Sequence, residues 1–570
     1  MEITLVQKLC KGLQVPVFAK KYSDAAAGLA LIVCIQLLVV PTQIALELHS
    51  VNLPASILVM FLVLFTMAIA SSVNGDTSKL YKKHLRGPTD FIGRHMSFGF
   101  VAFFVLLIRD HVDSSSDVPK LVGVFVLTTV ISYVASFLLA FIGFRLEQGL
   151  RRSRQAAVDL ESNNKTWPSP STAWPALPYE RRPGRIAQLS TLSEALSAKE
   201  PLKKITTVPN RSTTSIDFVL RTAPIWIWLF LLTTVGLPIY LATDYVMPFE
   251  VFSFTLFWVL SIQFQRSLRS SRTLLRFRRL RSFFLIFSNP IVLTWALTTT
   301  YMWTKTLYTG RDISTIMGEF RHYGSLSESI IRIMQDHAVP AHLGAGDLAG
   351  LLLDAGVACM GFKMYEYRSE LWASLGTVSF TCTALAAINV FLNVLVGHGF
   401  GLEAKEAIAF ASRSATLALG VPAIENLGGS TTLTSILAIF SGILFQMAGD
   451  WLFSLMRIND RVLRDAEPQP LKVAIPTKNH SLFGATTSVG STEAKNGNSG
   501  SCGTNEENII VAAGVTVGIN AAAMGTAYLI ERDSRAVAYS ALSMIMFGAA
   551  TVAMTALPGA GQIVMFLTSR

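Results

Sequence analysis

The sequence has few charged residues and few cysteines for its length. Only 15% of its 570 residues are Asp, Glu, Lys or Arg, whereas 51% are hydrophobic, and the mean hydropathy is +0.46. A soluble protein of this size needs more charge on its surface, so the composition excludes a soluble fold and favours a multi-pass membrane protein. The five cysteines are widely scattered, which indicates neither a metal site nor a disulfide framework.

The sequence also lacks the motifs that carry most enzymatic chemistry. No nucleophile has an adjacent base, and neither a Walker-type loop nor an HExxH motif is present. We therefore expect no catalytic residues, no metal, no cofactor and no enzymatic role. The formal net charge of +11 does not indicate nucleic-acid binding, because Lys and Arg gather in short loops beside apolar runs.

Apolar runs long enough to cross a hydrocarbon core recur along the chain. They predict an all-α polytopic integral membrane protein with about 11–13 membrane segments, some of them re-entrant or broken. Two polar stretches, residues 146–216 and 457–507, separate groups of runs. The first is rich in Arg, Ser and Pro and has no apolar period, so we expect a disordered linker on the cytosolic side.

The positions of the basic residues predict the orientation. The N-terminus, the 74–95 loop and the 266–281 segment all carry an excess of Lys and Arg. Loops of this kind stay in the cytosol, so we expect a cytosolic N-terminus. The sequence leaves open whether the membrane is the plasma membrane or the inner membrane of an organelle.

The most informative stretch is AFASRSATLALGVPAIENLGGSTTLTS, residues 409–435, where small, hydroxyl and charged residues interrupt the apolar pattern. A bilayer tolerates such a segment only where protein or water covers its backbone. Residues 404–427 are therefore predicted to form a re-entrant or broken helix, and GINAAAMGTA at 518–527 a similar interruption. Polar groups at membrane depth usually mark a path for a solute, so the stretch predicts a transporter with its site here.

The candidate substrate-binding residues lie around this stretch. The turn formed by Gly428, Gly429, Ser430 and Thr431 could bring backbone N–H groups to a carboxylate at the start of the next helix. Arg413 could be the charge partner of that carboxylate. Two structural alternatives stay open, since the glycines could form a packed turn and Arg413 could extend to a lipid headgroup. The remaining binding candidates are Ser414, Thr416, Thr434, Asn289, Asn520 and Thr526.

Several of these candidates have an equally simple structural role. Asn289 could satisfy the backbone at Pro290, while Asn520 and Thr526 could make interhelical hydrogen bonds. Asp354 and Glu425 are the candidates for proton coupling, although Glu425 could instead cap the turn.

The motifs resemble those of the LrgA/LrgB (CidA/CidB) membrane proteins, here joined in one chain as in a similar plant fusion of the chloroplast envelope. The first half resembles LrgA through NLPASILVMFLVLF and RHMSFGFVAFFV. The second half resembles LrgB through four ordered motifs. They are Ser288-Asn289-Pro290, the segment from Gly344 to Leu371, the stretch from Arg413 through LGGSTTLTS, and GVTVGINAAAMGTA from Gly514. Ala522 stands where that family usually has His, and Lys363 where it usually has Pro.

The resemblance divides the chain into an LrgA-like four-helix domain at 1–145, the linker at 146–216, an extra helix at 217–248 and an LrgB-like transport domain at 249–570. Since four helices return the chain to the cytosol, the extra helix is expected to act as a topological adapter. The resemblance implies transport of small monocarboxylates, with glycolate and glycerate first and pyruvate second, together with protons. It leaves open a homo-oligomer, and it also offers an alternative, a holin-like or regulatory membrane protein that controls lysis or cell death.

Overall fold

The computed structural model describes residues 15–49, 54–106, 118–164, 222–270, 284, 288–321, 343–455, 499–532 and 534–568. Helices dominate these residues, and no strand forms among them. Ten of the described helices are long and apolar enough to cross a membrane. The prediction of an all-α polytopic membrane protein is therefore confirmed. Most of the loop predicted at 457–507 and most of the linker predicted at 146–216 lie outside the described residues, whereas residues 146–164 and 499–507 are helical.

The first half begins with two long helices and continues through shorter ones. Pro54 precedes α3 in an extended conformation, and Asn74 ends that helix with a backbone N–H bonded to the Ala70 carbonyl. Helix α6 follows α5 directly, with only Met96 between them. The elements are α2 (Val15–Leu48), α3 (Ala55–Val73), α4 (Thr77–Leu80), η1 (Tyr81–Leu85), α5 (Arg86–His95), α6 (Ser97–Leu106) and α7 (Val118–Asn164).

The helix predicted as an adapter at 217–248 is observed at Thr222–Thr243 and includes η2 (Leu232–Gly236) and α10 (Leu237–Thr243). Only 6% of its apolar window is buried against the protein, as expected of a helix that contacts lipid. It is followed by α11 (Met247–Ser270), α14 (Pro290–Thr309) and α15 (Ile313–Phe320).

The remaining helices form the second half of the bundle. They are α17 (Ala345–Glu366), α18 (Arg368–Ile388), η3 (Asn389–Asn393), α19 (Val394–Gly399), α20 (Ala404–Ala409), η4 (Phe410–Ser412), α21 (Leu417–Glu425), α22 (Thr431–Leu455), α24 (Ser499–Glu531), α25 (Val537–Ala556) and α26 (Pro558–Thr568). Among the described residues, those up to 148 and those from 224 onward belong to one compact unit, whereas residues 149–164, 222 and 223 belong to another.

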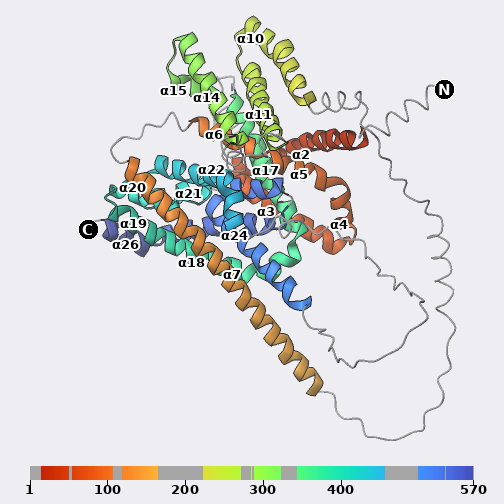
Figure 1. Ribbon diagram of the computed structural model, residues 1–570, viewed down its shortest axis with the longest axis vertical. Coiled ribbons are helices and arrows are strands. Elements are labelled where there is room, and N and C mark those ends of the chain that lie inside the picture. The colour runs from red at the N-terminus through yellow and green to blue at the C-terminus, as the bar shows by residue number, and fades with distance from the viewer. Residues whose placement is uncertain are drawn as a thin grey trace, which may run out of the picture. The chain divides into compact units, whose positions relative to one another are not determined.

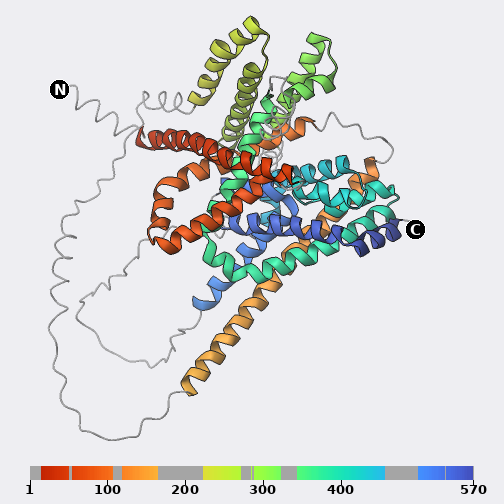
Figure 2. The same cartoon turned by 180° about the vertical axis from the view of Figure 1, so that it is seen from behind.

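Helix α17 joins the two halves of the larger unit. It packs against α2, α3, α5 and α6 of the first half and against α11 of the second (Figure 1). It also packs against α25 of the second half. The approach is close because α17 carries glycines: a Cβ on Gly361 would lie 2.3 Å from the Met60 carbonyl oxygen. From behind, α2 is seen in red, and it packs on α3, α5 and α17 (Figure 2).

Two helical segments are interrupted where the sequence predicted it. Residues 404–425 form α20, η4 and α21 rather than one helix, with a turn around Arg413 and Ser414. Helix α24 is broken at Ala522, whose φ of 46° and ψ of −136° are not helical. Within the protein such interruptions free backbone polar groups, so their surroundings locate the candidate site.

Candidate functional site

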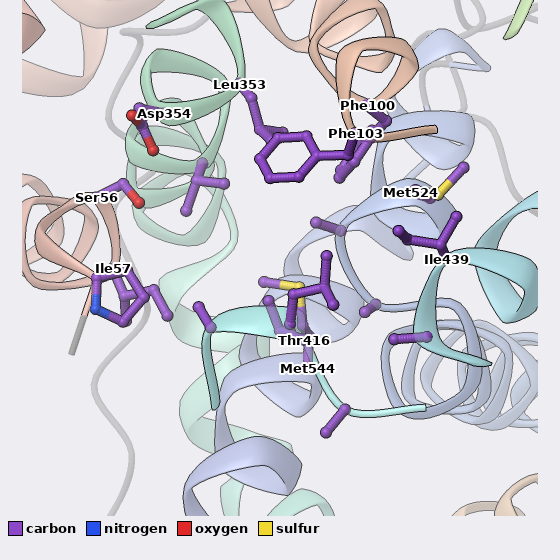
Figure 3. Close-up of a pocket in the computed structure, with 18 of the residues that line it drawn as sticks. Ser56, Ile57, Phe100, Phe103, Leu353, Asp354, Thr416, Ile439, Met524 and Met544 are labelled. Atoms are coloured by element: carbon purple, nitrogen blue, oxygen red, sulfur yellow. The ribbon is translucent and has the colours of Figure 1, made fainter. Parts of the chain in front are cut away.

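The two interruptions meet at one cavity of about 370 Å³. Residues 415–418 approach it from the turn before α21, and residues 521–524 approach it from the break in α24. The other walls come from α3, α6, α17, α22 and α25, so both halves of the chain contribute. Most of the lining is apolar, including Ile57, Phe100, Phe103, Leu353, Ile439 and Met544 (Figure 3).

The first polar feature of the cavity is the N-terminus of α21. Thr416 is the N-cap residue, its side chain makes no capping hydrogen bond, and its hydroxyl has no partner among the described residues. The N–H groups of Leu417 and Ala418 belong to the first turn, where a helix cannot satisfy them internally. Together with the helix dipole, this end of α21 offers hydrogen-bond donors and partial positive charge to a solute in the cavity.

The second polar feature is the carboxyl group of Asp354 on α17. The Ser56 hydroxyl of α3 hydrogen-bonds to it, and both side chains lie on one side of the cavity (Figure 3). Met524 and Ile439 lie on the opposite side. The cavity thus combines one carboxyl group, two hydroxyls and one helix N-terminus with an apolar wall.

Arg413 lies next to this cavity in sequence but does not line it. Its side chain is 1% exposed and points to α7, where Nη1 donates to the Thr129 hydroxyl at 2.6 Å and Nη2 donates to the Thr128 carbonyl at 3.3 Å. The guanidinium also lies 5.9 Å from the ring centre of Phe125. The side chain therefore does not extend to an exposed surface. Ser414 is buried beside it.

The Gly428-Gly429 turn does not reach the cavity. Gly428 has φ of +71° and reverses the chain after α21. Gly429 packs on α20 and α21, because a Cβ there would lie 2.6 Å from Ile408 and 2.7 Å from Ile424. Ser430 caps α22 by accepting a hydrogen bond from the Leu433 N–H at 3.2 Å. Thr431 begins α22, and Thr434 donates to the Ser430 carbonyl.

The other predicted site residues also lie away from the cavity lining. Asn289 caps α14 through the Ile291 N–H and donates to the Gln446 carbonyl. Asn520 donates to Ser136 on α7. Thr526 donates to the Ala522 carbonyl and shares a hydrogen bond with Ser540. Glu425 is exposed at the end of α21.

Of the predicted residues, the cavity thus brings together only Thr416 and Asp354. Sequence reasoning missed Ser56, Leu417 and Ala418. Ser56 gave no signal, since one serine in an apolar helix is common. The backbone of residues 417 and 418 could have been found from Thr416, because Thr is a favoured N-cap residue before an apolar run.

The fold and the cavity define a polytopic integral membrane protein built around two interrupted helices. Comparison with known proteins identifies the group more closely. Residues 278–467 and 507–558, which hold α14 to α22 and most of α24 and α25, match the LrgB-like family. This match supports the assignment to the LrgA/LrgB family that was made from the sequence motifs.

Curated relatives at lower similarity agree with this assignment. The holin-like protein CidB of Staphylococcus aureus is 22% identical over 123 residues, which cover 22% of this chain and 54% of the relative. The holin-like protein CidB of Staphylococcus epidermidis is 22% identical over 141 residues, covering 25% of this chain and 61% of the relative. The chain thus spans little more than half the length of these relatives. No solved structure matches the chain.

Proposed function

We propose that this chain is a secondary transporter of small monocarboxylates, with glycolate and glycerate as the first solutes and pyruvate as the second. The observation that supports this proposal is the meeting of two interrupted helices at one cavity inside the bundle. Interrupted helices at membrane depth are a recurrent way to present backbone groups to a solute. A protein that only spans or anchors gains nothing from them.

The cavity suits a solute with one negative charge and a short body. Its carboxylate would accept hydrogen bonds from the N–H groups of Leu417 and Ala418 and from the Thr416 hydroxyl. A 2-hydroxyl or 2-oxo group would face Asp354 and Ser56. The carboxyl of Asp354 could take up a proton with the solute and release it on the other side. Such a mechanism uses the solute, protons and the bilayer, and it needs no metal, cofactor or catalytic residue.

A second candidate function is favoured by the comparisons. The curated relatives carry the name holin-like protein CidB. A holin-like or regulatory protein would form a lesion or an assembly in the membrane, and it would need no selective solute site. Selectivity therefore separates the two functions.

The test is uptake of labelled glycolate, glycerate and pyruvate into proteoliposomes that hold the purified full chain. We expect saturable uptake that the unlabelled acids compete for and that an inward proton gradient stimulates. Ala438→Phe should reduce uptake at least tenfold, because Ala438 lines the cavity. Leu444→Phe on the same helix is the matched control, since Leu444 is 40% exposed.

Proton coupling is tested with a second pair of variants in the same vesicles. Asp354→Asn should abolish the stimulation by the proton gradient, whereas Glu425→Gln should not, because Glu425 is exposed and does not line the cavity. Uptake without competition, accompanied by leakage of a dye, would refute the transporter and support the holin-like function.

A further inference from the structure

The N-terminal half of α7 presents a polar stripe to the second half of the chain. Thr128, Thr129, Ser132 and Ser136 are each no more than 4% exposed. They recur at spacings of three and four residues, which place them on one side of a helix. At 1.5 Å per residue, Thr128 lies about 15 Å from the start of α7, near the middle of a hydrocarbon core of about 30 Å. Hydroxyls at this depth need polar partners within the protein.

The stripe contacts residues beside both interruptions. Thr128 and Thr129 accept hydrogen bonds from Arg413, which lies in the turn before α21. Ser136 accepts one from Asn520 at 2.8 Å, two residues before the break in α24. A helix of the LrgA-like half therefore supports both interrupted elements of the LrgB-like half.

Arg413 is not neutralised by these contacts. Its hydrogen bonds go to a hydroxyl and a carbonyl, and among the described residues it forms no ion pair. The Nε atom of Arg413 is buried and has no hydrogen-bond partner among the residues that the structure describes. A buried charge is normally paired, since removing it from water carries a penalty of several kcal/mol. An Arg held at this depth without an acid therefore points to a charge partner that is not a side chain.

Hydroxyl groups of the kind that bind an anion lie on α7 and on the turn that carries Arg413. The hydroxyls of Ser132, Tyr133 and Ser414 are buried and lack partners among the described residues. Tyr133 lies close enough to the guanidinium of Arg413 to interact with it electrostatically. Hydroxyl groups and a guanidinium N–H can all donate hydrogen bonds to one small anion. A cation at the same place would be repelled by the charge of Arg413.

We infer that Arg413 and the hydroxyls of α7 hold a small monovalent anion where the two halves meet, at a site separate from the cavity. Its ligand is chloride or the carboxylate group of a small acid. Anion binding here does not depend on transport, so it can be measured on a protein that moves no solute. The LrgA-like half thereby contributes part of a binding site rather than only a scaffold.

The test is thermal unfolding of the purified full chain in detergent, at constant ionic strength, with increasing sodium chloride or sodium glycolate replacing sodium isethionate. Binding to the folded state raises the midpoint with the logarithm of anion concentration. A rise with chloride identifies an inorganic anion, and a rise with glycolate alone identifies a carboxylate. Arg413→Gln should weaken the apparent affinity at least tenfold. Arg145→Gln, which changes an exposed Arg on α7, should leave the apparent affinity unchanged.

A milder variant covers the possibility that Arg413→Gln fails to fold. Tyr133→Phe leaves the charge of Arg413 and the aromatic ring in place but removes one hydroxyl donor. We expect it to weaken the apparent affinity for the anion severalfold. The inference is overturned if neither anion raises the midpoint, or if the rise is the same in the wild-type chain and in both variants.

Discussion

At the scale of single residues, position in the sequence was a poor guide to which polar side chains share a site. Arg413 and Thr416 are three residues apart, yet Arg413 points to α7 and Thr416 lines the cavity. Lys363 and Asp354 both lie on α17, yet Lys363 forms ion pairs with Asp90 at 2.6 Å and with Glu366 at 3.2 Å. Side-chain direction is set by the local backbone, and a turn changes it within one residue.

Gly429 illustrates how a packed turn can imitate a binding site. We expect Gly429→Ala to destabilise the protein by about 1–3 kcal/mol, because the new methyl group would overlap Ile408 and Ile424. The measurement is the thermal midpoint in detergent. Gly399→Ala is the control, since nothing lies within 4 Å of a Cβ at Gly399. An unchanged midpoint in Gly429→Ala, with a loss of solute uptake, would instead return the turn to the binding site.

At the scale of elements, composition predicted which helices are interrupted. Small and hydroxyl residues around Arg413 and around Asn520 lower the apolar content of their segments, and both segments are broken. Composition could not show which helix end faces the cavity. Sequence reasoning chose the start of α22 after Gly428, whereas the structure brings the start of α21 to the cavity. That difference depends on how α20 and α21 fold back, which is decided by contacts distant in sequence.

The break in α24 stores strain, because Ala522 has a φ of 46°, in a region that favours glycine. We expect Ala522→Gly to stabilise the protein by about 1 kcal/mol, as relief of strain exceeds the extra chain entropy of glycine. Ala523→Gly, at a helical position, should lower the thermal midpoint instead. If both variants lowered the midpoint alike, the break would not exist in solution.

At the scale of the whole molecule, the apolar runs were sufficient to predict an all-α membrane protein but not its internal packing. The sequence divided the chain into an LrgA-like and an LrgB-like half. It did not show that α17 of the second half is packed among α2, α3, α5 and α6 of the first. Helix–helix packing at this closeness depends on where glycines face bulky residues, as Gly356 faces Met96. Such matches cannot be read from one sequence.

The exposed basic residues predict the orientation of the molecule in the membrane. Lys82 and Lys83 are exposed after α3, so we expect this end of the bundle in the cytosol. Leu307, at the end of α14 and 85% exposed, should lie on the opposite side. In spheroplasts expressing cysteine-free protein, a membrane-impermeant maleimide should label Leu307→Cys directly and Lys82→Cys only after permeabilisation. The reverse pattern would place the N-terminus outside.

The polar stripe of α7 has a consequence for how the protein is made. A newly inserted first half would expose Thr128, Thr129 and Ser132 to lipid, and a second half without it would carry an uncovered Arg413. Unassembled membrane segments with exposed polar groups are the kind that cellular quality control retains and degrades. Joining both halves in one polypeptide ensures that each copy of α7 is synthesised together with the arginine it covers.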